Sequence, residues 1–212
     1  MGNTLNVNTS GAVVFNGTTF VGETLPISHG GTNATSFTPT GIVLYDGTSF
    51  INYAGPTITS DGYLKNNRQP SFFTTSTSNL TNISGDGTVY NVDFNSTLIN
   101  HSSSYNITTN IFTAPIAGTY SFHASFYRTS NGTSSSESGN IELVRPSLGN
   151  LTFQTHSDML NVRYTLQISC IVTMDAGDTA TLNYTAFGGT KNISLVSSST
   201  TINTFFQGWF LG

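Results

Sequence analysis

The sequence predicts an all-β protein, with a two-layer sandwich or jelly-roll head preceded by a fibrous segment of β-hairpins. Two observations support this fold class. Apolar residues alternate with polar ones in several long segments of the C-terminal two thirds, and no segment repeats apolar residues with the 3.6-residue period of a helix. A short N-terminal motif also occurs twice, each time around a dipeptide that favours a tight turn.

The composition indicates a folded chain with an uncharged polar surface. Only 8% of the residues are charged, against about 25% in an average protein, while Asn, Ser, Thr and Gly are abundant. The 36% of hydrophobic residues, with fifteen Phe and nine Tyr, can supply a real core. Such a composition is common in extracellular and virion fibres, so we expect an extracellular location.

Charge and hydropathy argue against two kinds of partner. The net charge is −4 and the first basic residue is Lys65, so the chain lacks the basic stripe that binds phosphate backbones. No apolar stretch approaches the roughly twenty residues of a membrane span. We therefore expect neither nucleic-acid binding nor membrane insertion.

Cys170 is the only cysteine, which rules out an internal disulfide.

The N-terminal repeat predicts two β-hairpins. The sequence AVVFNGTTFV of residues 12–21 aligns without a gap on IVLYDGTSFI of residues 42–51. Asn16-Gly17 and Asp46-Gly47 lie at the centres of the copies and readily adopt the positive φ angles of a two-residue type I′ turn. Asp61-Gly62 is a candidate third turn.

Residues 1–69 are predicted to form a fibrous stalk. Isolated hairpins bury little apolar surface, so we expect three copies to wind together and cover one another's strand edges. A flexible tether is the alternative. Between the hairpins, LPISHGGTNATSF of residues 25–37 resembles a glycine-turn segment of phage tail fibres and of fibre-like proteins of large viruses and bacteria.

Residues 70–212, here called the head, show the period of two expected of half-buried strands. Tyr120, Phe122, Ala124 and Phe126 alternate with polar residues, and a similar pattern extends from Val162 to Met174. These strands are expected to line one core.

The last strand is apolar on both faces, which predicts a second subunit. In TFFQGWFLG, Phe206 and Phe210 share one face, whereas Phe205, Trp209 and Leu211 share the other. The outer face of a single sandwich would meet water, so we expect another copy of the chain to pack there. The alternative is that the stalk covers this strand.

Three blocks in the head resemble the globular heads of complement subcomponent 1q and its tumour necrosis factor relatives. The strongest is YNITTNIFTAPIAGTYSF, residues 105–122, and the others are a Gly-Asp turn and the closing strand. The matching residues are Tyr105, Phe112, Thr113, Pro115, Gly118, Tyr120 and Phe122, then Ala176, Gly177 and Asp178, then Phe206, Gly208, Phe210 and Leu211.

The resemblance implies a ten-stranded jelly roll assembled as a tight homotrimer. The residues expected to form the core or the trimer contacts are Phe112, Gly118, Tyr120, Phe122, Phe206, Gly208, Trp209 and Phe210. It also implies that both ends of the head lie together and that the strand of Tyr120 delivers the loop of residues 128–140 to the opposite tip.

The tip is the expected ligand-binding surface. By the same topology we place the turn of residues 175–178 and the loop of residues 197–203 at the tip too. These segments are rich in hydroxyls and amides, which suits a polar ligand such as a glycan; simple solvated connections are the alternative. The candidate ligand-binding residues are Arg128, Asn131, Glu137, Asn140, Ser199 and Thr200.

Nothing in the sequence indicates an enzyme or a cofactor. The four histidines, His29, His101, His123 and His156, belong to no catalytic motif, and no nucleophile elbow or phosphate-binding loop occurs. Some heads of this type bind calcium near the trimer apex, which makes Asp175 and Asp178 weak candidates. The alternative for Asp178 is a turn-capping role.

Two functions therefore follow from the sequence. The first is a trimeric fibre-tip or adhesin protein whose head binds a cell-surface receptor, a glycan being one candidate. The second is a structural trimerising cap of a viral, spore or cell-surface fibre, with no ligand of its own.

Overall fold

The computed structural model describes residues 41–45, 47–48, 50–66, 68–130, 137–157, 163–198 and 200–212. The chain divides into two compact units, residues 1–65 and 66–212, and the head lies within the second. All the regular elements assigned in the described residues are strands. The all-β prediction is confirmed.

The first unit contains a small antiparallel sheet in the order β1-β2-β3. Its strands are β1 (Gly41–Tyr45), β2 (Phe50–Ile58) and β3 (Leu64–Asn66). The hairpin predicted around Asp46-Gly47 is present, but its last paired residues are Tyr45 and Phe50. The connection therefore takes residues 46–49 rather than two residues. The first copy of the repeat lies outside the described residues.

The turn predicted at Asp61-Gly62 connects β2 to β3. Gly62 has a φ of +84°, and its backbone N–H donates to the Thr59 carbonyl at 2.9 Å. Asp-Gly favours this conformation because glycine reaches positive φ without a steric penalty.

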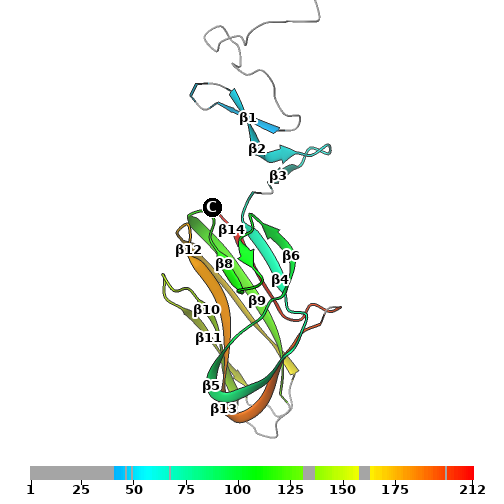
Figure 1. Cartoon of the computed structure of the whole chain (residues 1–212), viewed down its shortest axis with the longest axis vertical. Coiled ribbons are helices and arrows are strands. Elements are labelled where there is room, and N and C mark those ends of the chain that lie inside the picture. Colours follow the sequence, from blue (N-terminus) through cyan, green and yellow to red (C-terminus); the bar gives the residue numbers. More distant parts are fainter. Residues whose placement is uncertain are drawn as a thin grey trace, which may run out of the picture. The chain divides into compact units, whose positions relative to one another are not determined.

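The head is an antiparallel jelly roll whose strands form two layers (Figure 1). We call the inner sheet the layer with the order β6-β4-β14-β9-β12, and the outer sheet the layer with β5, β13, β10 and β11. The inner-sheet strands are β4 (Ser71–Thr75), β6 (Ser96–His101), β9 (Gly118–Ser130), β12 (Arg163–Met174) and β14 (Phe205–Phe210). The outer-sheet strands are β5 (Leu80–Asn91), β10 (Glu137–Val144), β11 (Leu151–Ser157) and β13 (Thr179–Val196), with the short β7 (Tyr105–Asn106) and β8 (Ile111–Thr113) beside β13.

The predicted alternation places the core between these layers. On β9, Tyr120, Phe122, Ala124 and Phe126 all have 0% exposed surface, so one face of the strand is completely buried. On β12 the same alternation begins at Leu166, with Leu166, Ile168, Val172 and Met174 buried and Cys170 half-buried. Because side chains of a strand alternate between its two faces, the other face of each strand points out of the inner sheet.

Two glycines of the signature blocks are required by close packing. Gly118 has a φ of +148°, and a Cβ there would lie 2.5 Å from the Phe210 ring. Gly208 is buried, and a Cβ there would lie 2.7 Å from the rings of both Phe122 and Phe72. Any side chain at either position would displace an aromatic ring of the core.

The first and last residues of the head lie at one end, as predicted. The Phe210 N–H donates to the Pro70 carbonyl at 2.9 Å, and the Thr119 N–H donates to the Gly212 carbonyl at 2.7 Å. We call this the terminal end of the head. From there β9 runs to Ser130 at the far end.

The prediction that residues 175–178 lie at the far end is wrong. Because β12 is antiparallel to β9, with Met174 opposite Gly118, the turn that follows β12 returns to the terminal end. There the Ala114 N–H donates to the Asp178 carbonyl at 2.8 Å, and the Gly177 N–H donates to the Ala114 carbonyl at 2.8 Å.

Candidate interaction surfaces

The outward face of the inner sheet carries exposed apolar and aromatic side chains. On β14, Phe205 and Trp209 project from the face opposite the buried Phe206, as the sequence predicted. Trp209 remains 39% exposed, and Ile171 on β12 is 67% exposed. Residues Phe73 and Ile99 of β4 and β6 lie opposite each other on the same sheet.

This face has an ordered aromatic centre. The ring of Phe205 contacts that of Phe73 edge-on, with centroids 5.5 Å apart, and lies 5.4 Å from the His123 ring at an angle of 31°. Trp209, Phe205, Phe73 and His123 therefore share one face of the sheet, on which Trp209 is exposed and the other three side chains are half-buried. We call this surface the aromatic face.

The candidate ligand-binding residues do not form one cluster. Arg128 is 1% exposed because β9 continues to Ser130 and places Arg128 on its inward side. Its assignment to an exposed loop is wrong. Glu137 and Asn140 belong to β10, so the predicted loop of residues 128–140 is shorter than expected. Asn140 is half-buried.

The other candidates lie in or beside loops. Asn131 and Ser199 lie outside the described residues. Thr200 is exposed, and its backbone N–H donates to the Ser198 hydroxyl at 3.1 Å. The same hydroxyl accepts the Thr201 N–H at 3.2 Å, so Ser198 caps a local turn in this loop.

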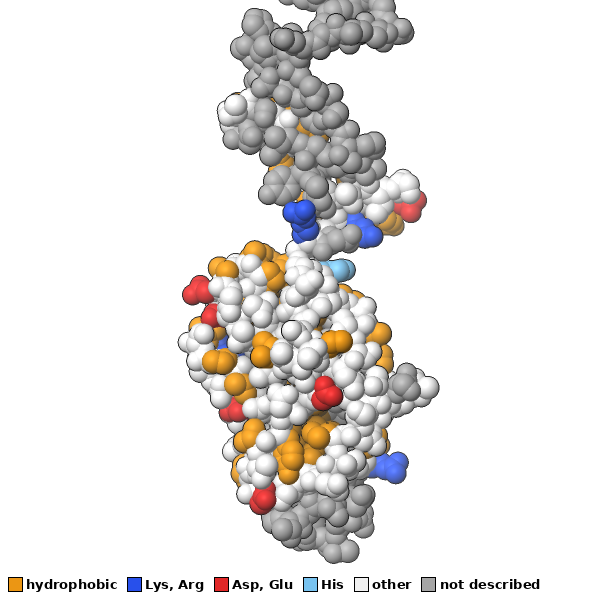
Figure 2. All heavy atoms as spheres, viewed as in Figure 1, with side chains coloured by type: hydrophobic (Ala, Val, Ile, Leu, Met, Phe, Trp, Pro, Cys, Tyr) orange, Lys and Arg blue, Asp and Glu red, His pale blue; other side chains and the backbone are white. Residues whose placement is uncertain are grey.

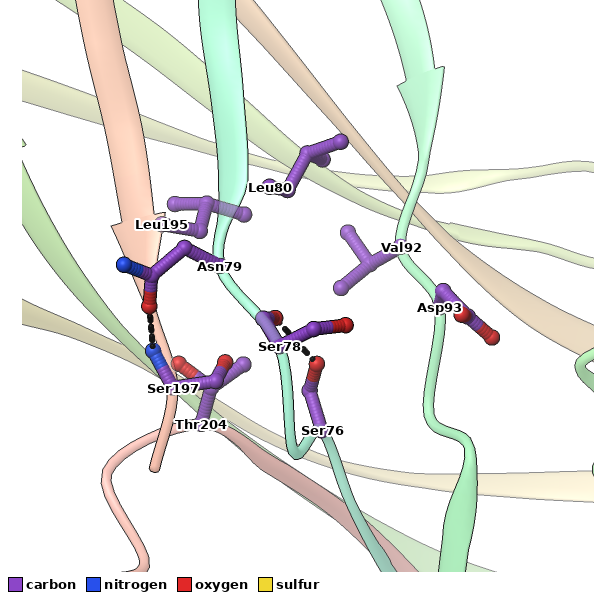
Figure 3. A pocket seen from close by; sticks show the side chains of 9 residues that line it. All are labelled: Ser76, Ser78, Asn79, Leu80, Val92, Asp93, Leu195, Ser197 and Thr204. Carbon is purple, nitrogen blue, oxygen red and sulfur yellow. Dashed lines mark hydrogen bonds between the residues drawn. The ribbon is translucent and has the colours of Figure 1, made fainter. Parts of the chain in front are cut away.

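The loop that follows β13 helps to form a pocket of about 230 Å³ between the two layers (Figure 3). Leu80, Val92 and Leu195 supply apolar walls, and the polar residues come mainly from the loops after β4 and β13. Asn79 fixes the two loops together, because its Oδ1 accepts the Ser197 N–H at 2.8 Å. The polar lining residues are Ser76, Ser78, Asn79, Asp93, Ser197 and Thr204.

Sequence reasoning missed most of this pocket. The loop of residues 197–203 was predicted as a binding segment, but the residues that follow β4 and β5 were not. They come into the same place only because the chain crosses from β4 of the inner sheet to β5 of the outer sheet, which pairs with β13, and no local pattern reveals that pairing.

Asp175 and Asp178 form hydrogen bonds with each other within their own turn. A carboxylate oxygen of Asp178 accepts the Asp175 N–H at 2.8 Å, and the Asp178 N–H donates to the Asp175 carbonyl at 3.0 Å. Among the described residues, no group of three or more His, Cys, Asp or Glu side chains could hold a metal ion.

Burial shifts the pKa values of three side chains in the described head. Burial raises the pKa of the Cys170 thiol, which is opposite to the lowered pKa of a reactive cysteine. Burial also raises the pKa of Tyr105 and Tyr120.

In the part of the chain that the structure describes, no helix is long and apolar enough to cross a membrane.

The antiparallel jelly roll and the signature blocks define a class of small β-sandwich domains. Within that class, the model of the C1q domain matches residues 71–211, so this chain belongs to the C1q domain family. The comparison with curated proteins found no match.

Solved structures with a similar fold include complement and tumour necrosis factor proteins. The globular domain of zebrafish complement 1qA is 18% identical over 68% of this chain and 98% of its own, with a TM-score of 0.41. Eiger TNF from S. frugiperda is 14% identical over 68% of this chain and 91% of its own, with a TM-score of 0.46. Murine APRIL at pH 5.0 is 10% identical over 68% of this chain and 99% of its own, with a TM-score of 0.47.

Proposed function

We propose that this protein is a homotrimeric, non-enzymatic recognition protein at the tip of a fibre, and that its head binds a receptor on a cell surface. Domains of the C1q and tumour necrosis factor type are typically trimeric, extracellular and engaged in recognition rather than catalysis. The observation that carries the proposal for this chain is the aromatic face, since Trp209 and Phe205 stay accessible on a single subunit.

The trimer is supported by the energetics of the aromatic face. Fully burying an exposed aromatic side chain contributes roughly 1.5–3 kcal/mol, and covering the surface that Trp209 and the half-buried Phe205 still expose contributes part of that amount in each subunit. Charge repulsion opposes this association little, because only 8% of the residues are charged, and charged side chains are sparse on the side of the head drawn in Figure 2.

The fibre is supported by the N-terminal repeat and by the exposed strands of the first unit. Val43, Leu44 and Tyr45 of β1 are between 44% and 54% exposed, so a single copy of this sheet leaves its apolar residues in water. Strands from neighbouring chains would cover them, which is the arrangement expected of a stalk. The place of such a fibre on a virion or a cell surface belongs to the same proposal.

A structural cap is the second candidate. The aromatic face and the exposed β1 residues together suffice to hold three chains in register, and trimerisation alone requires no ligand. This function predicts full assembly with no attachment to any cell.

The receptor contacts are proposed at the far end of the head, in the segment that joins β9 to β10. The test replaces residues 131–136 of the full chain with a Gly-Ser segment of equal length and measures attachment to target cells. The matched control replaces residues 146–149, which join β10 to β11. Because Val144 pairs with Thr181 near the start of β13, that turn lies at the terminal end.

We expect the first replacement to abolish attachment and the control to leave it intact, with both proteins still trimeric. Full attachment by the first variant contradicts a far-end site. Failure of the native trimer to attach to any cell favours the structural cap.

A further inference from the structure

The outward face of the outer sheet contains a shallow groove with a volume of about 250 Å³. Four neighbouring strands contribute to it. The lining residues are Gly87 and Val89 of β5, Thr185 and Phe187 of β13, Asn140 and Glu142 of β10, and Thr152 of β11.

Strand register brings these side chains together. Asn140 is paired with Thr185, which is paired in turn with Val89 on the next strand. Glu142 is paired with Thr152 on the other side. Directly opposed side chains on neighbouring antiparallel strands have Cβ atoms about 4.5–5.5 Å apart. The side chains of Asn140, Thr185 and Val89 therefore form one continuous row across three strands.

Buried core residues alternate with groove residues along β10 and β13, so the groove side chains point away from the core. Ile141, Leu143 and Tyr184 are completely buried, and therefore Asn140, Glu142 and Thr185 face the opposite way, out of the sandwich. Since the groove residues stand on paired strands rather than on loops, their positions are set before any ligand arrives.

A second polar row extends the groove. Asn183 lies opposite Glu142, and Asn91 lies opposite Asn183. The Asn91 side-chain amide donates to Asn183 Oδ1 at 3.3 Å and to the Thr181 hydroxyl at 3.2 Å. Amides and hydroxyls that each donate and accept hydrogen bonds thus cover the centre of the face.

One edge of the groove is apolar. Phe187 is 39% exposed and Val89 is 57% exposed, which is unusual on the water-facing side of a sheet. Gly87, with a φ of +89°, leaves the edge of the ring open, since a Cβ there would lie 3.4 Å from Phe187 Cε1. The phenyl ring is therefore available as a flat platform.

The groove carries negative charge. Glu142 is half-buried and accepts a hydrogen bond from the Thr152 hydroxyl at 3.3 Å. Asp86 lies opposite Phe187, and hydrogen bonds from Thr88 hold the pKa of its carboxyl below the ordinary value. The lining contains neither Lys nor Arg.

We propose that this groove binds a neutral carbohydrate. The hydroxyls of a sugar match the amides, hydroxyls and carboxylate of the two polar rows, and the apolar C–H face of a sugar ring matches Phe187 and Val89. Sialylated or sulfated sugars are disfavoured because they would bring negative charge next to Glu142 and Asp86. The role of this groove in cell attachment rests on the proposed receptor function, whereas the binding of a sugar to the groove does not.

The test applies the full-length chain to a printed array of neutral, sialylated and sulfated oligosaccharides. We expect binding to neutral sugars, and a loss of about tenfold or more in Phe187→Ala and in Glu142→Gln, as for residues that anchor an interface. Phe187→Tyr keeps an aromatic platform and should retain binding.

Two variants at the terminal end serve as matched controls. Leu148→Ala removes an exposed apolar side chain from the turn after β10, and Asp175→Asn removes an exposed carboxylate from the turn after β12. Both should bind like the native chain. Mass and melting temperature confirm that each variant keeps its assembly and fold.

Three results would overturn the groove site: no binding of the native chain to any neutral sugar, a preference for sulfated or sialylated sugars, or native-like binding by both groove variants. Failure of the receptor function looks different. In that case the native chain binds neutral sugars through the groove on the array, yet attaches to no cell.

Discussion

Phe112 lies at the centre of the aromatic core of the head. Its ring centroid lies 5.2 Å from that of Phe72, 5.3 Å from that of Tyr120 and 5.2 Å from that of Phe122, and its side chain is 1% exposed. Phe112→Ala leaves a large cavity among rings that cannot close it, so we expect a loss of about 3–5 kcal/mol in the free energy of unfolding. Urea denaturation measures this, and an unchanged midpoint would contradict the assignment.

Gly118 is the second residue on which the core depends. Gly118→Val introduces a branched side chain at positive φ and within contact of Phe210 and the Gly212 carbonyl. We expect this variant to melt well below the native head or to fail to fold. Gly149→Ala is a suitable comparison, because Gly149 also has positive φ but open space around it. Equal melting temperatures for the two variants would show that packing at Gly118 is unimportant.

At the residue scale the sequence predicts the core better than the ligand contacts. The alternation that buries Tyr120, Phe122 and Phe126 continues to Arg128, which is equally inward. The sequence carries this signal, but the topology implied by the resemblance placed Arg128 in the loop that follows the strand of Tyr120–Phe126. The sequence does not indicate that Thr185 and Phe187 line a groove, because that depends on which strands of the outer sheet pair with each other.

At the scale of elements, β14 carries the aromatic residues of the proposed subunit interface. Its apolar residues on both faces were evident in the sequence, and the structure places Phe206 in the core and Trp209 on the aromatic face. Trp209→Glu puts a charge into the proposed interface without touching the core. We expect it to yield a folded monomer, detected by light scattering together with a native far-ultraviolet spectrum. A trimeric Trp209→Glu variant would place the interface elsewhere.

The turn after β12 illustrates what local pattern cannot supply. Its Ala-Gly-Asp residues indicate a turn, but the end of the head at which this turn lies depends on the direction of β12. That direction follows from the path of the chain through β10 and β11. Asp178→Ala removes the carboxylate that accepts the Asp175 N–H. We expect a loss of about 1 kcal/mol in stability by urea denaturation; a calcium-dependent rise in the native melting temperature would instead indicate a metal site.

At the scale of the whole molecule, the head contains the complete core and all three signature blocks. We therefore expect residues 70–212 to fold and trimerise alone, whereas residues 1–69 alone should not fold stably. Amide exchange on the separate fragments measures this. Slow exchange in the isolated N-terminal fragment would mean that it has a packed core of its own.

We propose above all that this chain functions as a trimer held together by the aromatic face. The most direct test is the mass of the full-length protein in solution, measured by light scattering at micromolar concentration. An obligate interface typically buries upward of about 2,000 Å², and an assembly of that kind persists at this concentration. We expect the mass of three chains. The mass of a single chain would contradict this proposal.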